Sequence, residues 1–304
     1  MLFPTRWAAI SSRLRLPALS KMEEGRRLHP EVVDGFGGNN ASFYEKARPG
    51  YPAQALSAIV AEICRSGIIG KGQFLVDLGA GTGKFTRQIL PFARAEGLSL
   101  IGVEPVKAMR DQFEVAVPGV RVVQGTGDAI PVPDSSARAL VAAQSFHWMS
   151  SPGTLREVHR VLVPGGLLVL VWNTRDYTRP WVRALEDIID PFYGDDVPRQ
   201  QSGQWRKSFN YLKQSSDDGQ QRRLFFGELT ERHFKHSQLL TPAELADRMR
   251  SISVIATRPE LERADAVRRA QRLIDTHPDT RQQLRMSGSV ELFYDTEVYW
   301  CRKV

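Results

Sequence analysis

Residues 74–90, FLVDLGAGTGKFTRQIL, place an apolar run, a glycine-rich turn and a helical pattern in immediate succession. The apolar run reaches Asp77, glycines follow at every second position from Gly79, and helix-like spacing begins at Lys84. Glycine has no Cβ and tolerates positive φ, so such a turn lets the backbone approach a ligand closely. Three ligand classes fit this kind of turn: a nucleoside triphosphate, a dinucleotide or S-adenosylmethionine.

The spacing of the glycines separates these ligands. A triphosphate loop that ends in Lys84 needs Gly at 78 and Ser or Thr at 85, where the chain has Leu78 and Phe85. A dinucleotide turn that uses Gly79 needs a further glycine at position 84, which Lys84 occupies. The first ligand is therefore discarded and the second is disfavoured.

Two acidic residues favour S-adenosylmethionine. Glu104 closes the next apolar run, SLIGVEP at 99–105, where its carboxylate can accept hydrogen bonds from both hydroxyls of a ribose. Asp77 can orient the loop, or it can receive an ammonium group, which S-adenosylmethionine has and a dinucleotide lacks. The combination DLGAGTG and GVEP thus indicates a methyl-donor site.

Strand and helix patterns alternate from about residue 55 to 173, which predicts an α/β fold with a parallel sheet covered on both faces. The expected strands are 74–79, 99–105, 120–125, 138–146 and 167–173, with helices at 53–66 and from 84 to about 94. Residues 174–232 show no strand pattern and are too long for a bare loop, so a helical cap insertion is expected there. The alternation resumes at 233–240, and Thr241 with Glu244 predicts a capping box for the next helix. A helix at 259–276 and a closing strand at 289–304 complete the chain.

Charge and cysteine content exclude several classes of protein. Residues 1–27 hold six basic and two acidic residues of a chain whose net charge is +7, which leaves a nearly balanced body and predicts no nucleic-acid partner. The two cysteines, Cys64 and Cys301, lie in no CxxC or Cys/His cluster, so no metal site is expected.

The N-terminal segment 1–35 is interpreted as a basic leader, either disordered or a targeting segment, before a domain at 36–304. Its first 22 residues lack Asp and Glu and mix Arg, Ser and apolar positions, as mitochondrial presequences do. Met22 as the true initiator is the competing interpretation. A cytoplasmic location is the expectation, with a mitochondrial one as the alternative. No run of 18 apolar residues predicts a membrane span.

Several further segments occur in a fixed order along the chain: FYEKARPGYP, GTGDAIPVPDSS, AAQSFHWM, EVHRVLVPGG, LVWNTRD and FYDTEVYWC. With VDLGAGTGKFT and GVEP they resemble the class I, Rossmann-like S-adenosylmethionine-dependent methyltransferases. The similarity covers about residues 40–304 and is greatest to the branch of trans-aconitate methyltransferase and related small-molecule enzymes. It implies a doubly wound, seven-stranded, mostly parallel sheet with an antiparallel last strand. A small-molecule acceptor and a monomer or homodimer are expected.

The resemblance assigns the cofactor contacts. The expected cofactor-binding residues are Tyr44, Asp77, Gly79, Ala80, Gly81, Gly83, Glu104, Thr126, Gly127, Asp128 and Gln144. This chain departs from its relatives at two of them, because Thr126 stands where many carry Asp and Asp128 where they carry Glu. Which of these side chains reads the adenine is left open. Arg138 replaces another frequent Asp.

The reaction side is expected at the carboxyl ends of the fourth and fifth strands. His147 is the candidate catalytic residue, as a general base or as a hydrogen-bond partner of the substrate, with packing of the following helix as the alternative. The expected substrate contacts are Arg48, Tyr51, Trp148, Trp172, Asn173 and Arg175. Methyl transfer from a sulfonium is an in-line displacement, so alignment rather than a catalytic triad is expected.

Two other functions stay open. A cofactor-binding regulatory protein of the same fold could have lost the chemistry. A protein or RNA methyltransferase is disfavoured, because AAQSFHW stands where an NPPY-type tetrapeptide would follow the fourth strand.

Overall fold

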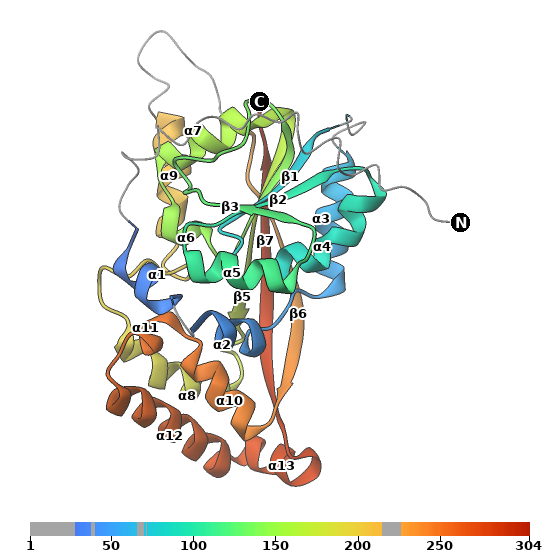
Figure 1. Ribbon diagram of the computed structural model, residues 1–304. Coiled ribbons are helices and arrows are strands. Elements are labelled where there is room, and N and C mark those ends of the chain that lie inside the picture. The colour runs from blue at the N-terminus through green and yellow to red at the C-terminus, as the bar shows by residue number, and fades with distance from the viewer. Residues whose placement is uncertain (1–27, 38–39, 66–69, 71, 215–225) are drawn as a thin grey trace.

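The computed structural model describes residues 28–37, 40–65, 70, 72–214 and 226–304. In these ranges seven strands form one sheet in the spatial order β3-β2-β1-β4-β5-β7-β6 (Figure 1). They are β1 (Phe74–Leu78), β2 (Ser99–Val103), β3 (Arg121–Val123), β4 (Ala137–Ala143), β5 (Leu162–Arg175), β6 (Thr230–Leu240) and β7 (Val290–Arg302). The first five are parallel, and β7 pairs antiparallel with both β5 and β6. The predicted fold class is confirmed.

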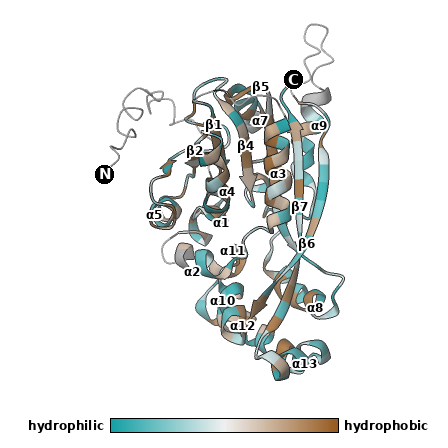
Figure 2. Ribbon diagram, turned by 90° about the vertical axis from the view of Figure 1, so that its right-hand side faces the viewer, coloured by the Kyte–Doolittle hydropathy of each residue, from teal (hydrophilic) through white to brown (hydrophobic). Residues whose placement is uncertain are grey.

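Helices cover both faces of the sheet. Neighbouring residues of β1 point to opposite sides, so Leu75 packs with α3 (Ala53–Arg65) and α4 (Lys84–Ala95), whereas Val76 packs with α7 (Pro152–Val161). The central strand β4 is largely in apolar colours in Figure 2. This two-sided burial explains why the strands show no regular polar alternation.

Three strand boundaries differ by three residues or more from the sequence prediction. One is the start of β6, which lies at Thr230 and not at 233, inside the segment expected to carry no strand. The expected strand 138–146 ends at Ala143, because Gln144 has a left-handed φ of 60° and the short helix α6 (Phe146–Met149) follows. The expected strand 167–173 begins earlier, at Leu162, which pairs with Ala137 across an irregular register. The capping box at Thr241 is confirmed at the start of α10 (Pro242–Arg250).

A second group of helices gathers at one end of the sheet, around the protruding ends of β6 and β7 (Figure 1). It comprises α8 (Pro180–Ile189), α10, α11 (Ser253–Ala256), α12 (Glu260–Thr276) and α13 (Pro278–Ser287). The helices of segment 174–232 divide between two cores. Trp181 on α8 packs in this group, whereas Trp205 packs against the main sheet.

The remaining helices lie beside the sheet or join these two parts. They are α1 (Pro30–Gly35), α2 (Asn40–Ala47), α5 (Lys107–Ala116), α9 (Lys207–Gln214) and the short 3-10 helices η2 (Asp190–Phe192) and η3 (Gln204–Arg206). The expected leader lies outside the described residues up to position 27, and its end forms α1, which packs against α11. None of the helices in the described ranges is long and apolar enough to cross a bilayer.

Candidate active site

A cavity of about 290 Å³, here the first cavity, lies at the carboxyl ends of β1, β2 and β4. It is lined by eight of the expected cofactor residues: Tyr44, Gly79, Gly81, Glu104, Thr126, Gly127, Asp128 and Gln144. Ala80 and Gly83 belong to the same loop but do not line it, and neither does Asp77. The sequence motifs therefore converge on one place in the fold.

Positive φ and close packing both favour glycine at two positions of the turn. Gly79 has φ +69°, and a Cβ there would lie 2.5 Å from the Cβ of Ser145. Gly83 caps the start of α4 with φ +84°, and a Cβ there would lie 2.5 Å from Cγ2 of Val117. Any other residue would add both left-handed strain and a clash, so packing and backbone conformation require these glycines.

Glu104 at the end of β2 faces this turn with both carboxylate oxygens engaged. Oε2 accepts the backbone N–H of Gly81 at 2.9 Å, and Oε1 accepts that of Val106 at 2.9 Å. Burial raises the pKa of this carboxyl group, against the lowering effect of the two backbone donors. Glu104 thus fixes the loop and borders the cavity at once.

Asp77 lies beneath the loop rather than in the cavity. Oδ2 accepts a hydrogen bond of 2.6 Å from Oγ1 of Thr86, which ties β1 to α4, while Oδ1 is buried with no hydrogen-bond partner among the described residues. Burial raises the pKa of Asp77 to about 7. Of its two expected roles, this geometry matches orientation of the loop.

Thr126 and Asp128 meet at the edge of the first cavity. The Thr126 hydroxyl donates to Oδ1 of Asp128 at 2.7 Å, and their backbone is held by paired hydrogen bonds between Thr126 and Ala129. Both side chains line the first cavity, so this hydrogen-bonded pair stands at its edge.

Sequence reasoning missed the residues that cover the first cavity from outside the sheet. They are Leu28, His29, Val32 and Phe36 at α1, Met109 on α5, and Asp196 and Pro198 before η3. His29 Nε2 lies 3.9 Å from Oδ2 of Asp196, which brings these two distant segments together. No motif marks these positions, because they act by placement in the fold and not by a characteristic spacing.

A second cavity of about 90 Å³ adjoins the first and lies against the end of β5, α2 and α10. Phe36, Tyr44, Gln144, Trp148 and Pro198 line both cavities. The second cavity brings together these residues predicted for the reaction side: Arg48, His147, Trp148, Trp172, Asn173 and Arg175. Tyr51 does not line it, because its ring packs edge-on against Phe85 in the core.

Four arginines line the second cavity, and they differ in whether a carboxylate neutralises their charge. Arg175 is bound by the buried Glu186 at 2.5 Å, and Arg199 by Asp190 at 2.5 Å. Arg48 and Arg248 form no ion pair with any residue that the structure describes. The region therefore carries an excess of positive charge.

The hydrogen bonds of Arg48 and Arg248 are all to neutral groups. Arg48 Nη2 donates to the carbonyl of Ser251 at 2.8 Å, and its buried Nε has no partner among the described residues. Arg248 is 4% exposed and donates from Nε to the hydroxyl of Tyr294 at 3.3 Å. Burial and the neighbouring Arg248 lower the pKa of Arg48 to about 10.

His147 on α6 borders the second cavity beside Trp172 of β5. The indole Nε1 of Trp172 donates to Nδ1 of His147 at 3.1 Å. Burial and the positive charge of Arg48 lower the pKa of His147 to about 3, so the imidazole is neutral at physiological pH.

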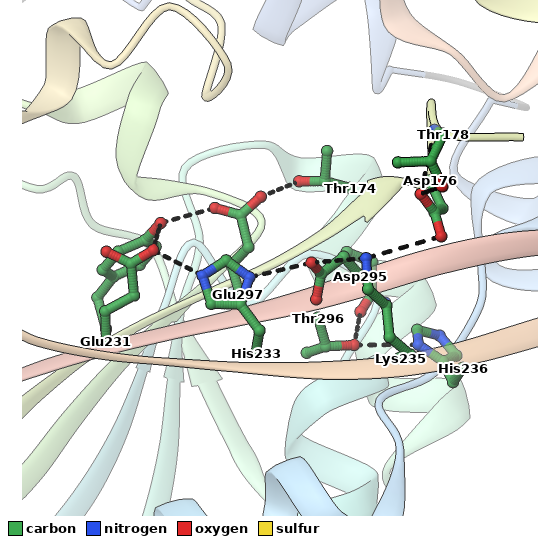
Figure 3. Close-up of polar contacts among 12 residues, drawn as sticks. Thr174, Asp176, Thr178, Glu231, His233, Lys235, His236, Asp295, Thr296 and Glu297 are labelled. Atoms are coloured by element: carbon green, nitrogen blue, oxygen red, sulfur yellow. Dashed lines mark hydrogen bonds and ion pairs between the residues drawn. The ribbon is translucent and has the colours of Figure 1, made fainter. Parts of the chain in front are cut away.

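A polar network on β6 and β7 supports the far side of the second cavity. Glu297 accepts hydrogen bonds of 2.7 Å from both Thr174 and Gln200, which line that cavity. The Tyr299 hydroxyl joins Glu297 to Glu231. Glu231 in turn contacts His233, and Figure 3 shows both residues beside Glu297. The network holds the cavity wall in place through strand register.

Sequence comparison finds a domain family and several proteins that are similar to this chain. A family model described as "Methyltransferase domain" matches residues 76–170. An uncharacterized methyltransferase of Mycobacterium tuberculosis is 33% identical over 242 residues, which cover 79% of this chain and 86% of that protein. An uncharacterized methyltransferase-like protein of Schizosaccharomyces pombe is 33% identical over 260 residues, which cover 86% of this chain and 92% of that protein.

Among solved structures, that of a candidate type II methyltransferase from Anaeromyxobacter dehalogenans matches with a TM-score of 0.51. It is 17% identical and covers 84% of this chain and 97% of its own, so it shows the fold alone. The matched family segment begins in β1, whose end borders the first cavity, and ends in β5, whose end borders the second cavity. The sequence relatives and the domain match show that the chain belongs to the methyltransferases that use S-adenosylmethionine.

Proposed function

We propose that the chain transfers the methyl group of S-adenosylmethionine to a small molecule that carries an anionic group. The supporting observation is the pair Arg48 and Arg248, which line the second cavity without a carboxylate partner among the described residues. Because a buried charge without a counter-ion is costly, such a pair suits a site that a ligand completes.

The chemistry of the pair narrows the ligand group. A guanidinium offers several N–H donors in a planar fork that matches a carboxylate or a phosphate. Nε of Arg48 has no hydrogen-bond partner among the described residues, so its N–H is available to donate to a ligand. Arg175 and Arg199 are neutralised by Glu186 and Asp190, and their proposed role is to shape the cavity rather than to bind the anion.

The first cavity is proposed to hold the cofactor. The turn at Gly79 and Gly81 would approach it through the backbone, and Glu104 would accept hydrogen bonds from its ribose hydroxyls. Thr126 or Asp128 would border the adenine. When bound, S-adenosylmethionine supplies a methyl group on a sulfonium, which is already an activated leaving group.

The chain's contribution to the reaction is alignment and exclusion of water. Gln144 and Trp148 line both cavities, so an acceptor in the second cavity lies next to the contents of the first. Gln144 is held there by its backbone N–H, which donates to the carbonyl of Val171 at 2.7 Å despite a positive φ. Correct positioning of two reactants can supply most of the barrier lowering.

The small volume of the second cavity favours a metabolite over a protein or RNA acceptor. Membership of the trans-aconitate branch, a cytoplasmic location and a monomeric or homodimeric state remain predictions. A domain over 36–304 and a catalytic role for His147 are proposals of the same kind.

The test incubates the purified chain with cofactor labelled in the methyl group and a metabolite extract. Labelled small-molecule product is the expected result. Cofactor binding in calorimetry without transfer to any extract would favour the regulatory alternative. Absence of both binding and transfer would contradict the proposal.

A further inference from the structure

The contact between Trp172 and His147 determines which imidazole nitrogen carries the proton. An indole Nε1 is a donor only, and it lies 3.1 Å from Nδ1 of His147. Nδ1 must therefore offer its lone pair. In a neutral imidazole the proton then resides on Nε2.

The geometry around Trp172 keeps this arrangement in place. Trp172 is 1% exposed, with ring centroids 5.0 Å from Trp205 and 5.8 Å from Tyr299. The imidazole itself lies 5.1 Å from the indole ring of Trp148, which limits its rotation. Both partners of the hydrogen bond are held by packing.

The charges that face His147 oppose its protonation. Arg48 just after α2, Arg175 on β5, Arg199 before η3 and Arg248 on α10 line the same cavity, where Glu186 and Asp190 pair with Arg175 and Arg199. Tyr44 and Tyr193 also face this space. A protonated ring would in addition turn its Nδ1–H against the indole N–H.

No group in the described part of the chain accepts a hydrogen bond from Nε2 of His147, and the residue lines the second cavity. We infer that Trp172 is a positioning residue that fixes His147 as its Nε2–H tautomer, so that His147 presents a neutral hydrogen-bond donor to the acceptor. His147 then acts as a donor and not as a general base. The tautomer itself is a property of the free protein, whereas its use on an acceptor rests on the proposed function.

The direct test is a long-range 1H–15N NMR correlation on the uniformly labelled free protein from pH 6 to 8. The His147→Gln variant identifies which of the histidine signals belongs to position 147. The expected spectrum shows the Nε2–H tautomer throughout, with no titration. The Nδ1–H tautomer, or an imidazolium in this range, would overturn the inference without bearing on methyl transfer.

Two substitutions separate the hydrogen bond from the packing. Trp172→Phe removes the indole donor and is expected to give a mixture of tautomers. Trp205→Phe is the matched control, because the buried Nε1 of Trp205 has no hydrogen-bond partner among the described residues. A mixed tautomer in both variants, or in neither, would contradict the assigned role of Trp172; if Trp172→Phe does not fold, the wild-type spectrum still decides.

Activity with a metabolite extract and labelled cofactor gives the second readout. His147→Gln keeps an N–H donor near the position of Nε2, whereas His147→Ala removes it. A donor role predicts that Gln retains about 2- to 10-fold more transfer than Ala, the value of one hydrogen bond. Equal loss in the two variants would indicate a general base.

Discussion

The two cavities differ in how the chain builds them. The first is bordered by the turn at Gly79 and by the ends of β2 and β4, which the sequence marks with recognisable spacings. The second collects Arg48 just after α2, Arg175 from β5 and Arg248 from α10, segments that are about 70 to 200 positions apart in the chain. Local motifs therefore mark the sheet side of the first cavity, whereas the second cavity is assembled from segments distant in the chain.

The two cavities also differ in how the chain satisfies their charged side chains. At the first cavity Glu104 is held by backbone N–H groups of the loop and of α5, so the fold itself satisfies it. At the second cavity Arg48 and Arg248 donate hydrogen bonds to neutral oxygens, and the Arg48 guanidinium lies 5.1 Å from the centroid of the Tyr44 ring. The absence of a carboxylate partner for Arg48 and Arg248 among the described residues supports the proposed anion at the second cavity, because a buried charge without a counter-ion is costly.

The largest effect is expected on catalysis, when the second cavity loses Arg248. Arg248→Met should lower kcat/KM by about 30- to 5000-fold, because loss of one partner in a buried charge pair costs about 2–5 kcal/mol. Steady-state transfer to the identified acceptor measures it. The control is Arg250→Met on the same helix, where an exposed pair with Asp247 contributes little. Equal rates for the two variants would contradict the anion site.

The glycine turn gives the next largest effect. Gly79→Ala should lower the free energy of unfolding by about 3 kcal/mol, from left-handed strain and overpacking against Ser145. Gly203→Ala has a similar φ of +66° but open space, so it should cost only about 1 kcal/mol. Chemical denaturation measures both. Equal losses would show that crowding at the turn is unimportant.

Glu104 tests the cofactor side of the comparison. Glu104→Gln should weaken binding of S-adenosylmethionine by about 10- to 100-fold, because hydrogen bonds to a charged group contribute about 1.5–3 kcal/mol. Calorimetry with the cofactor measures the change, and Glu114→Gln on the exposed face of α5 is the control. Unchanged affinity in Glu104→Gln would remove this residue from the cofactor site.

The last prediction concerns pH. The folded protein raises the pKa of Asp77 from 3.8 to about 7, so it binds a proton more tightly than the unfolded chain. Stability from this group is present below pH 3.8 and is lost as pH rises towards 7. Asp77→Asn should therefore gain stability relative to wild type as the pH rises from 4 to 8. Thermal unfolding at both pH values checks this; a difference that is independent of pH would contradict it.

Much of the fold was predictable from local pattern. The apolar runs around Val76 and Leu140, buried on both faces, gave the parallel sheet and most strand positions. The end of β4 was not predictable, because no sequence signal marks the left-handed conformation of Gln144 and apolar residues continue after it. The early start of β5 at Leu162 depends on pairing with Ala137, which is a tertiary contact.

The candidate site divides in the same way. Motif spacing predicted Gly79 and Glu104 for the first cavity, and strand ends predicted His147 and Arg175 for the second. Arg248 was missed, since an arginine on an amphipathic helix resembles many solvent-exposed ones until the helix is placed. Its position beside Arg48 comes from the docking of α10 against α2.

The central claim is that the acceptor carries an anionic group bound by Arg48 and Arg248. The most direct measurement separates a metabolite extract on an anion exchanger and tests each fraction with methyl-labelled cofactor and the purified chain. We expect label to enter only the retained, anionic fraction, and Arg48→Met to abolish it while cofactor binding persists. Label in the unretained fraction, at a rate that Arg48→Met leaves unchanged, would contradict the account.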